Sequence, residues 1–171
     1  MVALYLCCPL GLVMRLLPGS SLKHLFSFST GLLLMQWVFG STWIHPMVAS
    51  LFTYVVCAVG PQRHAHKIVM LFQLGYLFLC HLYYQYAYYM SPMLAFTGTQ
   101  MVLTMKLSAF AYNLHDGRTF ARARSEGRTL SRSEQAMSKL AVDSMPSPLA
   151  FLGYAFSFTS ILAGPAFEYQ V

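Results

Sequence analysis

The stretch from Ile68 to Met105 decides the fold. It reads IVMLFQLGYLFLCHLYYQYAYYMSPMLAFTGTQMVLTM and contains no charged residue over 38 positions. A second uncharged run covers the 39 residues from His24 to Gln62, and a third covers the 24 residues from Ser144 to Phe167. One membrane-spanning helix needs about 20 mostly apolar residues. The first two runs are each long enough for two spans, so the sequence predicts a polytopic (multi-pass) integral membrane protein.

The amino-acid composition supports this prediction. Hydrophobic residues make up 57% of the 171 residues and charged residues only 9%, whereas a soluble domain usually carries about 25% charged residues. The composition therefore argues against a soluble globular protein, and also against a disordered chain, which needs low hydrophobicity. The length suits one domain. We expect residues 1–171 to form a single transmembrane domain with a charged cytosolic loop at residues 116–145.

The predicted fold class is all-α, a polytopic transmembrane helical bundle with about six membrane segments. Proline and glycine mark the breaks, since proline lacks an N–H group and clashes with the preceding helical turn. Such breaks occur at Pro18, Gly40 to Pro46, Gly60–Pro61 and Ser91–Pro92. The predicted segments are Val2–Leu17, Leu25–Trp43, Ile44–Gly60, Ile68–Met90, Met93–His115 and Pro148–Phe167.

The basic residues give this segmentation an orientation. Ten of the eleven lysines and arginines flank or lie in the first, third and fifth loops, and the second and fourth loops contain none. Cytoplasmic loops carry an excess of Lys and Arg, so the odd-numbered loops are predicted to face the cytosol. We interpret the net charge of +6 as this topology signal and expect no nucleic-acid partner, because no basic face separates from the membrane segments. The ten residues are Arg15, Lys23, Arg63, Lys67, Arg118, Arg122, Arg124, Arg128, Arg132 and Lys139.

Two further features fit the predicted membrane boundaries. Five tyrosines from Tyr83 to Tyr89 lie at the non-cytosolic end of the fourth segment, where interfacial belts favour Tyr; a tyrosine cage for a ligand is the less favoured alternative. In the charged stretch, Ser131 and Glu134 have the spacing of a capping box, which predicts a short helix. The stretch is either a solvated loop or a site whose arginines attract an anionic partner, such as lipid headgroups or a phosphorylated cosubstrate.

Lys106 lies in the middle of the fifth segment, where a lysine costs roughly 2.5–3.5 kcal/mol to insert. Thr99, Lys106 and Asn113 are spaced by seven, so they lie nearly in line on a helix. Small or polar residues share this stripe, which is typical of a face that packs closely against another helix. Lys106 either pairs with a neighbour on such a packing face or lines a polar tunnel, and the sequence leaves both open. The rest of the stripe is Ala95, Gly98, Val102, Ala109 and Asp116, whereas Leu103, Leu107, Phe110 and Leu114 are predicted to lie elsewhere.

The residues alone show no complete catalytic constellation. His115 adjoins Asp116, and such pairs serve in general-base chemistry, but adjacent side chains on a helix point about 100° apart and are not expected to hydrogen-bond. The His64-x-His66 pair lies in a short loop and is predicted to be solvated. The four cysteines form no C-x-x-C pair, so we expect buried thiols and no metal site. They are Cys7, Cys8, Cys57 and Cys80.

Two stretches of the chain resemble a known family. Residues 100–117 read QMVLTMKLSAFAYNLHDG, and residues 145–154 and 161–169 read MPSPLAFLGY and ILAGPAFEY. Together they are similar to the lysophospholipid acyltransferase branch of the membrane-bound O-acyltransferase family. Members of that branch share a lysine-bearing span that ends in an (N/H)DG-type turn, followed by a charged loop, a P-S-L-L-E-Y-like helix start and an L-A-G-P turn.

The chain also departs from the family pattern. Ala150 matches the family's glutamate in P-S-L-L-E-Y, and Pro148 replaces a leucine. The resemblance places the catalytic histidine and its partner asparagine beyond the L-A-G-P turn, so neither has a matching position up to Val171. The chain therefore looks like the N-terminal part of a longer protein, incomplete relative to the family fold, and His115 is not expected to be the catalytic histidine.

The resemblance implies an enzyme that transfers a fatty acyl group from acyl-CoA to the free hydroxyl of a lysophospholipid. Acyl-CoA would be a cosubstrate, no cofactor would be bound, and the implied location is the endoplasmic reticulum membrane, among membrane lipids. This fragment alone is expected to be inactive and to hold no catalytic residue. The alternative is a non-catalytic small membrane transporter or scaffold protein that uses Lys106 as a contact, although no internal repeat supports it. The candidates for lining a substrate tunnel are Thr99, Lys106, Asn113, His115 and Asp116.

Overall fold

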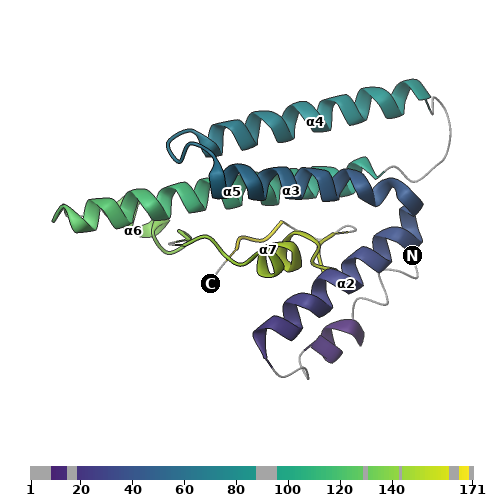
Figure 1. The fold of residues 1–171 in the computed structure, drawn as a ribbon, viewed down its shortest axis with the longest axis horizontal. Helices are drawn as coiled ribbons and strands as arrows, with labels where there is room; N and C mark the ends of the chain where they lie inside the picture. The colour runs from purple at the N-terminus through teal and green to yellow at the C-terminus, as the bar shows by residue number, and fades with distance from the viewer. Residues whose placement is uncertain are drawn as a thin grey trace.

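The structure is a computed structural model that describes residues 9–14, 19–87, 96–128, 131–142, 144–161 and 166–169, and these residues form helices, turns and irregular segments without a strand. The all-α prediction is therefore confirmed for the described part of the chain (Figure 1). The elements are α2 (Ser20–Phe39), the 3-10 helix η1 (Gly40–Trp43), α3 (Ile44–Val59), α4 (Ala65–Ala87), α5 (Thr97–Ser125), α6 (Arg132–Met137) and α7 (Pro148–Ala155).

Three helices, α3, α4 and α5, run side by side and form the body of the molecule (Figure 1). α2 precedes η1 and lies at a steep angle to them, and the short α7 packs between α2 and these three helices. The change of direction at η1 begins at Gly40, whose φ of 60° is a backbone conformation that favours glycine. The predicted breaks at Gly40 to Thr42 and at Gly60–Pro61 are thus confirmed, since α3 ends at Val59.

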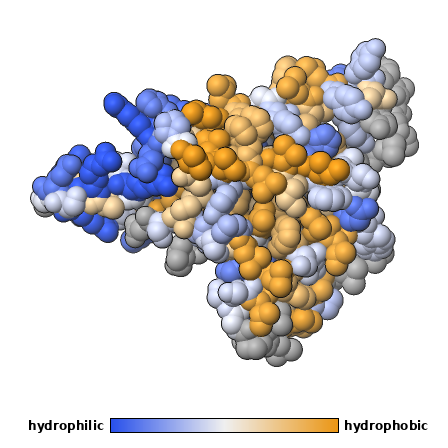
Figure 2. Space-filling model, viewed as in Figure 1, coloured by the Kyte–Doolittle hydropathy of each residue, from blue (hydrophilic) through white to orange (hydrophobic). Residues whose placement is uncertain are grey.

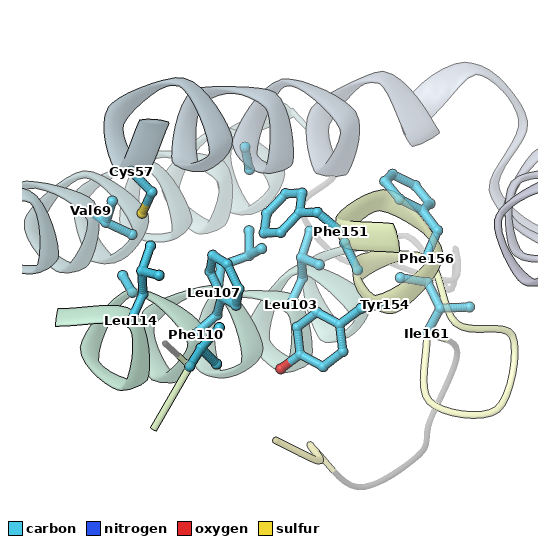
Figure 3. Packing of buried hydrophobic residues seen from close by; sticks show 14 of the residues in the cluster. Cys57, Val69, Leu103, Leu107, Phe110, Leu114, Phe151, Tyr154, Phe156 and Ile161 are labelled. Atoms are coloured by element: carbon cyan, nitrogen blue, oxygen red, sulfur yellow. The ribbon is translucent and has the colours of Figure 1, made fainter. Parts of the chain in front are cut away.

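The core lies where α5 meets α7 and α3. Buried apolar residues recur every three or four positions along α5, at Leu103, Leu107, Phe110 and Leu114. The first three lie toward Phe151 of α7, and Leu114 lies near Cys57 of α3 and Val69 of α4 (Figure 3). In lipid this packing is stabilised chiefly by van der Waals contact, because acyl chains are as apolar as leucine. The stripe expected to face the neighbouring helix was therefore only partly right. The buried face of α5 is centred on the apolar row that was predicted to lie elsewhere, with Thr99 and Lys106 at the edge of that face, whereas Gly98 is exposed.

Small residues allow α7 to approach α2 closely. The Oγ of Ser27 donates a hydrogen bond of 3.0 Å to the carbonyl oxygen of Gly153. A Cβ at Gly153 would lie 2.8 Å from the carbonyl oxygen of His24, and a Cβ at Gly31 would overlap the carbonyl oxygen of Phe156. This is the small-residue contact that membrane helices use to pack closely, and it involves α2 and α7 rather than the stripe predicted on α5.

Large apolar side chains cover much of the outside of α3 and α4. Val59 is 84% exposed and Leu71 is 77% exposed, and the runs Ser20–Val59 and Ala65–Ala87 are long and apolar enough to cross a membrane. Figure 2 shows apolar residues over the central part of the molecule and hydrophilic ones gathered at the end formed by α6 and the C-terminal turns of α5. This arrangement suits a protein whose helical body contacts lipid and whose charged end contacts water.

Six membrane segments are not confirmed, and the predicted segment Pro148–Phe167 is wrong. α7 ends at Ala155, and the chain then turns through residues 156–161. Eight helical residues rise about 12 Å, well short of the roughly 30 Å of a bilayer core. Ser147 accepts a hydrogen bond from the Ala150 N–H and Pro148 occupies the first turn, so the predicted helix start is correct although the length is not.

The predicted end of the fifth segment at His115 is also wrong. α5 continues to Ser125, so the first part of the charged stretch is helical and Gly117 lies inside the helix. A Cβ at Gly117 would overlap the carbonyl oxygen of Val142, and the Val142 N–H donates to the carbonyl oxygen of Asn113 at 3.0 Å. The glycine therefore makes room for the returning chain and does not stop the helix.

Other sequence predictions have mixed outcomes. The capping box of Ser131 and Glu134 is present and begins α6. Residues 9–14 are helical, and the rest of the predicted segment Val2–Leu17 lies outside the described residues, as do Cys7, Cys8 and the break at Ser91–Pro92. Cys57 and Cys80 are free and buried, as expected.

Candidate functional site

Lys106 is the centre of the most unusual arrangement of polar groups in the described part of the chain. Its side chain is 1% exposed, and its Nζ donates hydrogen bonds to the carbonyl oxygen of Tyr154 at 2.6 Å and to the Oγ of Ser160 at 3.0 Å. A longer contact of 3.5 Å reaches the carbonyl oxygen of Ala155. The amino group thus contacts the end of α7 and the turn that follows it.

The choice of partners has a physical reason. The last carbonyl groups of a helix have no partner within the helix, and the C-terminal end carries partial negative charge. Within the described residues no carboxylate pairs with Lys106. The amino group of Lys106, on α5, donates hydrogen bonds to carbonyl oxygens at the end of α7, and lipid offers no donor for these oxygens. The lysine and the helix end therefore stabilise one another.

Two aromatic rings complete the surroundings of the amino group. Lys106 Nζ lies 4.5 Å from the centroid of the Tyr154 ring and 4.4 Å from that of Phe167. The Tyr154 hydroxyl lies within hydrogen-bond distance of two carbonyl oxygens, that of Phe167 at 2.8 Å and that of Lys106 at 3.3 Å. A positively charged amino group would gain cation–π stabilisation here in addition to its hydrogen bonds.

These contacts support the packing interpretation of Lys106 over the tunnel interpretation. The polar hydrogens of its amino group are directed at protein groups of α7 and residues 156–161, and Lys106 is absent from the lining of the cavity beside it. A role of Lys106 in a substrate tunnel stays a prediction.

The cavity beside this cluster has a volume of about 350 Å³ and lies between α2, α7 and residues 166–169. Its lining mixes aromatic, hydroxyl and charged side chains, of which Tyr154 is shared with the Lys106 cluster. Asn113 approaches this cavity from α5, since its Nδ2 lies 3.5 Å from the Oε2 of the lining residue Glu168, a long contact for a hydrogen bond. The lining residues are Met14, His24, Ser27, Gly153, Tyr154, Ser157, Thr159, Phe167, Glu168 and Tyr169.

Thr99 lies nearer the start of α5 and is 1% exposed. Its Oγ1 has no hydrogen-bond partner within the described residues, and the same is true of the buried side-chain polar atoms of Gln100 and of Thr104. Buried polar groups in a membrane helix normally pair with protein or water. These groups mark a polar segment of α5 that is separate from the Lys106 cluster.

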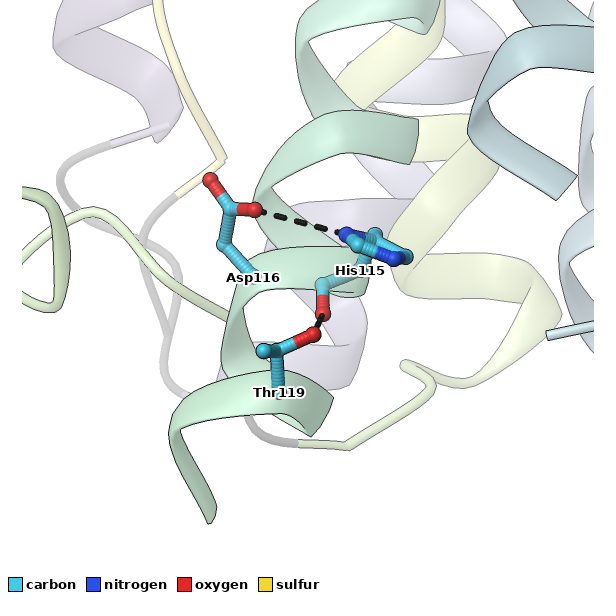
Figure 4. Close-up of polar contacts among 3 residues, drawn as sticks. All are labelled: His115, Asp116 and Thr119. Carbon is cyan, nitrogen blue, oxygen red and sulfur yellow. Dashed lines mark hydrogen bonds and ion pairs between the residues drawn. The ribbon is translucent and has the colours of Figure 1, made fainter. Parts of the chain in front are cut away.

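His115 and Asp116 follow Asn113 by two and three residues, toward the charged end of α5. The His115 Nδ1 lies 3.4 Å from the Asp116 Oδ1 (Figure 4), so the expectation that the neighbours would not meet is wrong, although the contact is long. The His115 ring also lies 4.0 Å from the ring of His66, which is 7% exposed. His66 is therefore buried between helices and not solvated as predicted.

The five predicted tunnel residues therefore do not converge on one cavity. Lys106 contacts the end of α7, and Asn113 contacts a residue that lines the neighbouring cavity. The Thr99 hydroxyl is buried and has no hydrogen-bond partner within the described residues. His115 lines a different, basic cavity near the α3–α4 turn, together with Arg63 and Arg118. Sequence reasoning missed Ser160 and Tyr154 as partners of Lys106, because no spacing rule connects a lysine to a backbone carbonyl 48 residues away.

The two stretches that carry the family resemblance form one packed unit. Phe110 of the first stretch contacts Phe151, Tyr154 and Tyr169 of the second, with ring centroids 5.0, 6.4 and 5.6 Å apart. Lys106 hydrogen-bonds across the same interface. Residues of the two stretches that resemble the family thus hold α5, α7 and residues 166–169 together.

Fold and site together define a helical protein with two runs long and apolar enough to cross a membrane, in which a buried lysine holds the end of the short helix α7. Residues 81–171 match the model of MBOAT, the membrane-bound O-acyltransferase family. The chain belongs to the membrane-bound O-acyltransferase family.

Curated relatives carry names of one enzyme type. The chain is 34% identical over 152 residues to lysophospholipid acyltransferase 6 of Drosophila melanogaster, covering 89% of this chain and 20% of that protein. It is 35% identical over 164 residues to the lysophospholipid acyltransferase of Schizosaccharomyces pombe, covering 93% and 30%. It is 31% identical over 153 residues to membrane-bound glycerophospholipid O-acyltransferase 2 of Rattus norvegicus, covering 89% and 28%. The chain thus spans between a fifth and a third of the length of these relatives.

Proposed function

We propose that this chain belongs to an enzyme that transfers a fatty acyl group from acyl-CoA to the free hydroxyl of a lysophospholipid. The observation that carries the proposal is the similarity of 89–93% of the chain to proteins named as lysophospholipid or glycerophospholipid acyltransferases. Both the acyl tail and the lysophospholipid partition into the membrane, which suits a chain with two runs of spanning length. We place the enzyme in the endoplasmic reticulum, as the resemblance implies.

The proposed reaction is direct transfer. A general base takes the proton of the lysophospholipid hydroxyl, and the oxygen attacks the thioester carbonyl carbon. The C–S bond breaks, the ester bond forms, and the CoA thiolate leaves and takes up a proton. We assign no catalytic residue to this chain and propose that the base is the family's histidine, outside residues 1–171.

The residues of this chain would position the acceptor site. Lys106 holds the end of α7, and α7 and residues 166–169 form two walls of the 350 Å³ cavity. We propose that this cavity receives part of a lipid substrate, because its aromatic and apolar lining is mixed with hydroxyl groups. Loss of the Lys106 contacts would then disturb the cavity without removing a reacting group.

Acyl transfer by the complete protein tests the proposal. Membranes containing the protein encoded by the whole transcript should convert radiolabelled oleoyl-CoA and lysophosphatidylcholine, lysophosphatidylethanolamine or lysophosphatidylserine to the diacyl product. Membranes containing only residues 1–171 should show no product above the vector control. Turnover by residues 1–171 alone would overturn the assignment of the base to a segment outside them.

The alternative, a non-catalytic transporter or scaffold, is distinguished by the transcript. A coding sequence beyond Val171 with an asparagine and an apolar segment bearing a histidine supports the enzyme. A stop codon directly after Val171, with no acyl transfer in membranes, would support the alternative.

A further inference from the structure

A second cavity lies at the charged end of the molecule, between the α3–α4 turn and α5. It has a volume of about 470 Å³. Three of its lining residues are arginines, and they come from two segments that are more than 50 residues apart in the sequence. The lining residues are Gln62, Arg63, His115, Arg118, Thr119 and Arg122.

The arginines differ in how they are held. The Nη2 of Arg118 donates to the carbonyl oxygen of Cys57 at 3.2 Å, which fixes the half-buried guanidinium at the end of α3. Arg63 and Arg122 are exposed, and within the described residues neither forms an ion pair. The Asp116 carboxylate contacts the lining residue His115 and is not itself among the lining residues. The cavity therefore has two uncompensated guanidinium groups and one that is held in place.

The position of the cavity favours an amphiphilic anion over a freely soluble one. It lies at the turn between two helical runs that are long and apolar enough to cross a membrane, and the turn between two spans is found at the membrane surface. Large apolar side chains next to this turn are exposed on both helices, at Val59 in α3 and at Ile68 and Leu71 in α4. A molecule with a phosphate group and acyl chains would place the phosphate among the arginines and the chains along this apolar surface.

We propose that this cavity binds the phosphate headgroup of an anionic membrane phospholipid. The chemistry is that of arginine with phosphate, where planar guanidinium groups donate paired hydrogen bonds to phosphate oxygens. Basic pockets between membrane helices on the cytoplasmic side are a known setting for such headgroups. The site is separate from the Lys106 cluster, and the inference does not rest on the proposed acyl transfer.

Titration of the purified chain in neutral maltoside micelles with dioctanoyl phosphatidic acid tests the site. Within the described part of the chain the exposed side chains of Arg63 and Arg122 form no hydrogen bond or ion pair. The double variant R63Q/R122Q should therefore fold as the parent does, which size-exclusion chromatography and circular dichroism verify. We expect its affinity for the lipid to fall about thirtyfold, the effect of two basic contacts near a membrane surface. The matched control R124Q/K139Q removes the same charge from residues outside the cavity and should change the affinity less than threefold.

Three competitors decide between sources of the phosphate. Dioctanoyl phosphatidylcholine, CoA and inorganic phosphate should each bind at least tenfold more weakly than phosphatidic acid. Equal binding of phosphatidylcholine would show that the headgroup charge is not recognised, and equal binding of CoA or inorganic phosphate would show a site for soluble phosphates; either result overturns the proposal. Equal loss of affinity in both double variants would overturn it as well, because net charge and not the cavity would then determine binding.

Discussion

Replacing Gly31 by alanine should destabilise the protein by about 3 kcal/mol, near the upper end of the cost of overpacking a tight contact. The added Cβ would overlap the carbonyl oxygen of Phe156 and lie 2.9 Å from its carbonyl carbon. Both atoms are backbone, so no side-chain rotation relieves the clash, and α7 must move away from α2. The measurement is the midpoint of unfolding of the detergent-solubilised protein in a dodecyl sulfate titration.

Gly75→Ala is the matched control. Gly75 lies inside α4, and a Cβ there meets nothing within 4 Å. Alanine is favoured over glycine in a helix by about 1 kcal/mol, so this variant should be as stable as the parent or more stable. Similar midpoints for Gly31→Ala and Gly75→Ala would contradict the close packing of α2 against α7.

Replacing Lys106 by methionine should cost about 2–3 kcal/mol, since the carbonyl group of Tyr154 and the hydroxyl of Ser160 would lose a buried donor. Methionine keeps most of the volume of the side chain, so the loss reports on the hydrogen bonds and not on a cavity. Amide hydrogen exchange should accelerate most in residues 150–161, because the end of α7 loses its partner. The matched control is Lys139→Met, which replaces an exposed lysine and should change neither stability nor exchange in residues 150–161.

The same variant separates the two interpretations of Lys106. The packing role predicts that stability and acyl transfer by the complete protein fall together, and that exchange changes around α7. Unchanged stability and exchange with a loss of acyl transfer would instead show that Lys106 contacts substrate. That result would remove the basis for treating the lysine as the anchor of α7.

The local signals in the sequence predicted local features well. Glycine and proline at Gly40 and Gly60–Pro61 mark real breaks, because the backbone preferences of these residues act without tertiary context. The capping box at Ser131 and the predicted helix start at Pro148 are present for the same reason. Two of the apolar runs also form helical stretches that are long and apolar enough to cross a membrane.

The larger failures depend on contacts between distant segments. The run from Ser144 to Phe167 is apolar enough for a span, but α7 ends at Ala155, where Lys106 of another helix reaches the carbonyl groups at its end. Gly117 suggests a helix end in the sequence, but in the structure it lies inside α5, where the absence of a side chain lets the Val142 backbone pack against the helix. The arginine cavity was missed because Arg63 and Arg122 meet only when α4 packs along α5.

Vectorial labelling tests most directly whether the basic ends of these helices gather at one membrane face. Single cysteines are introduced by Arg63→Cys, Arg124→Cys and Tyr86→Cys into a chain without its native cysteines, and sealed vesicles of uniform orientation are treated with a membrane-impermeant maleimide. Tyr86 is 93% exposed near the opposite end of α4 from Arg63. The first two sites should be labelled from the same side, and the third only from the other. Labelling of the Arg63 and Arg124 sites from opposite sides would contradict the bundle and the arginine cavity.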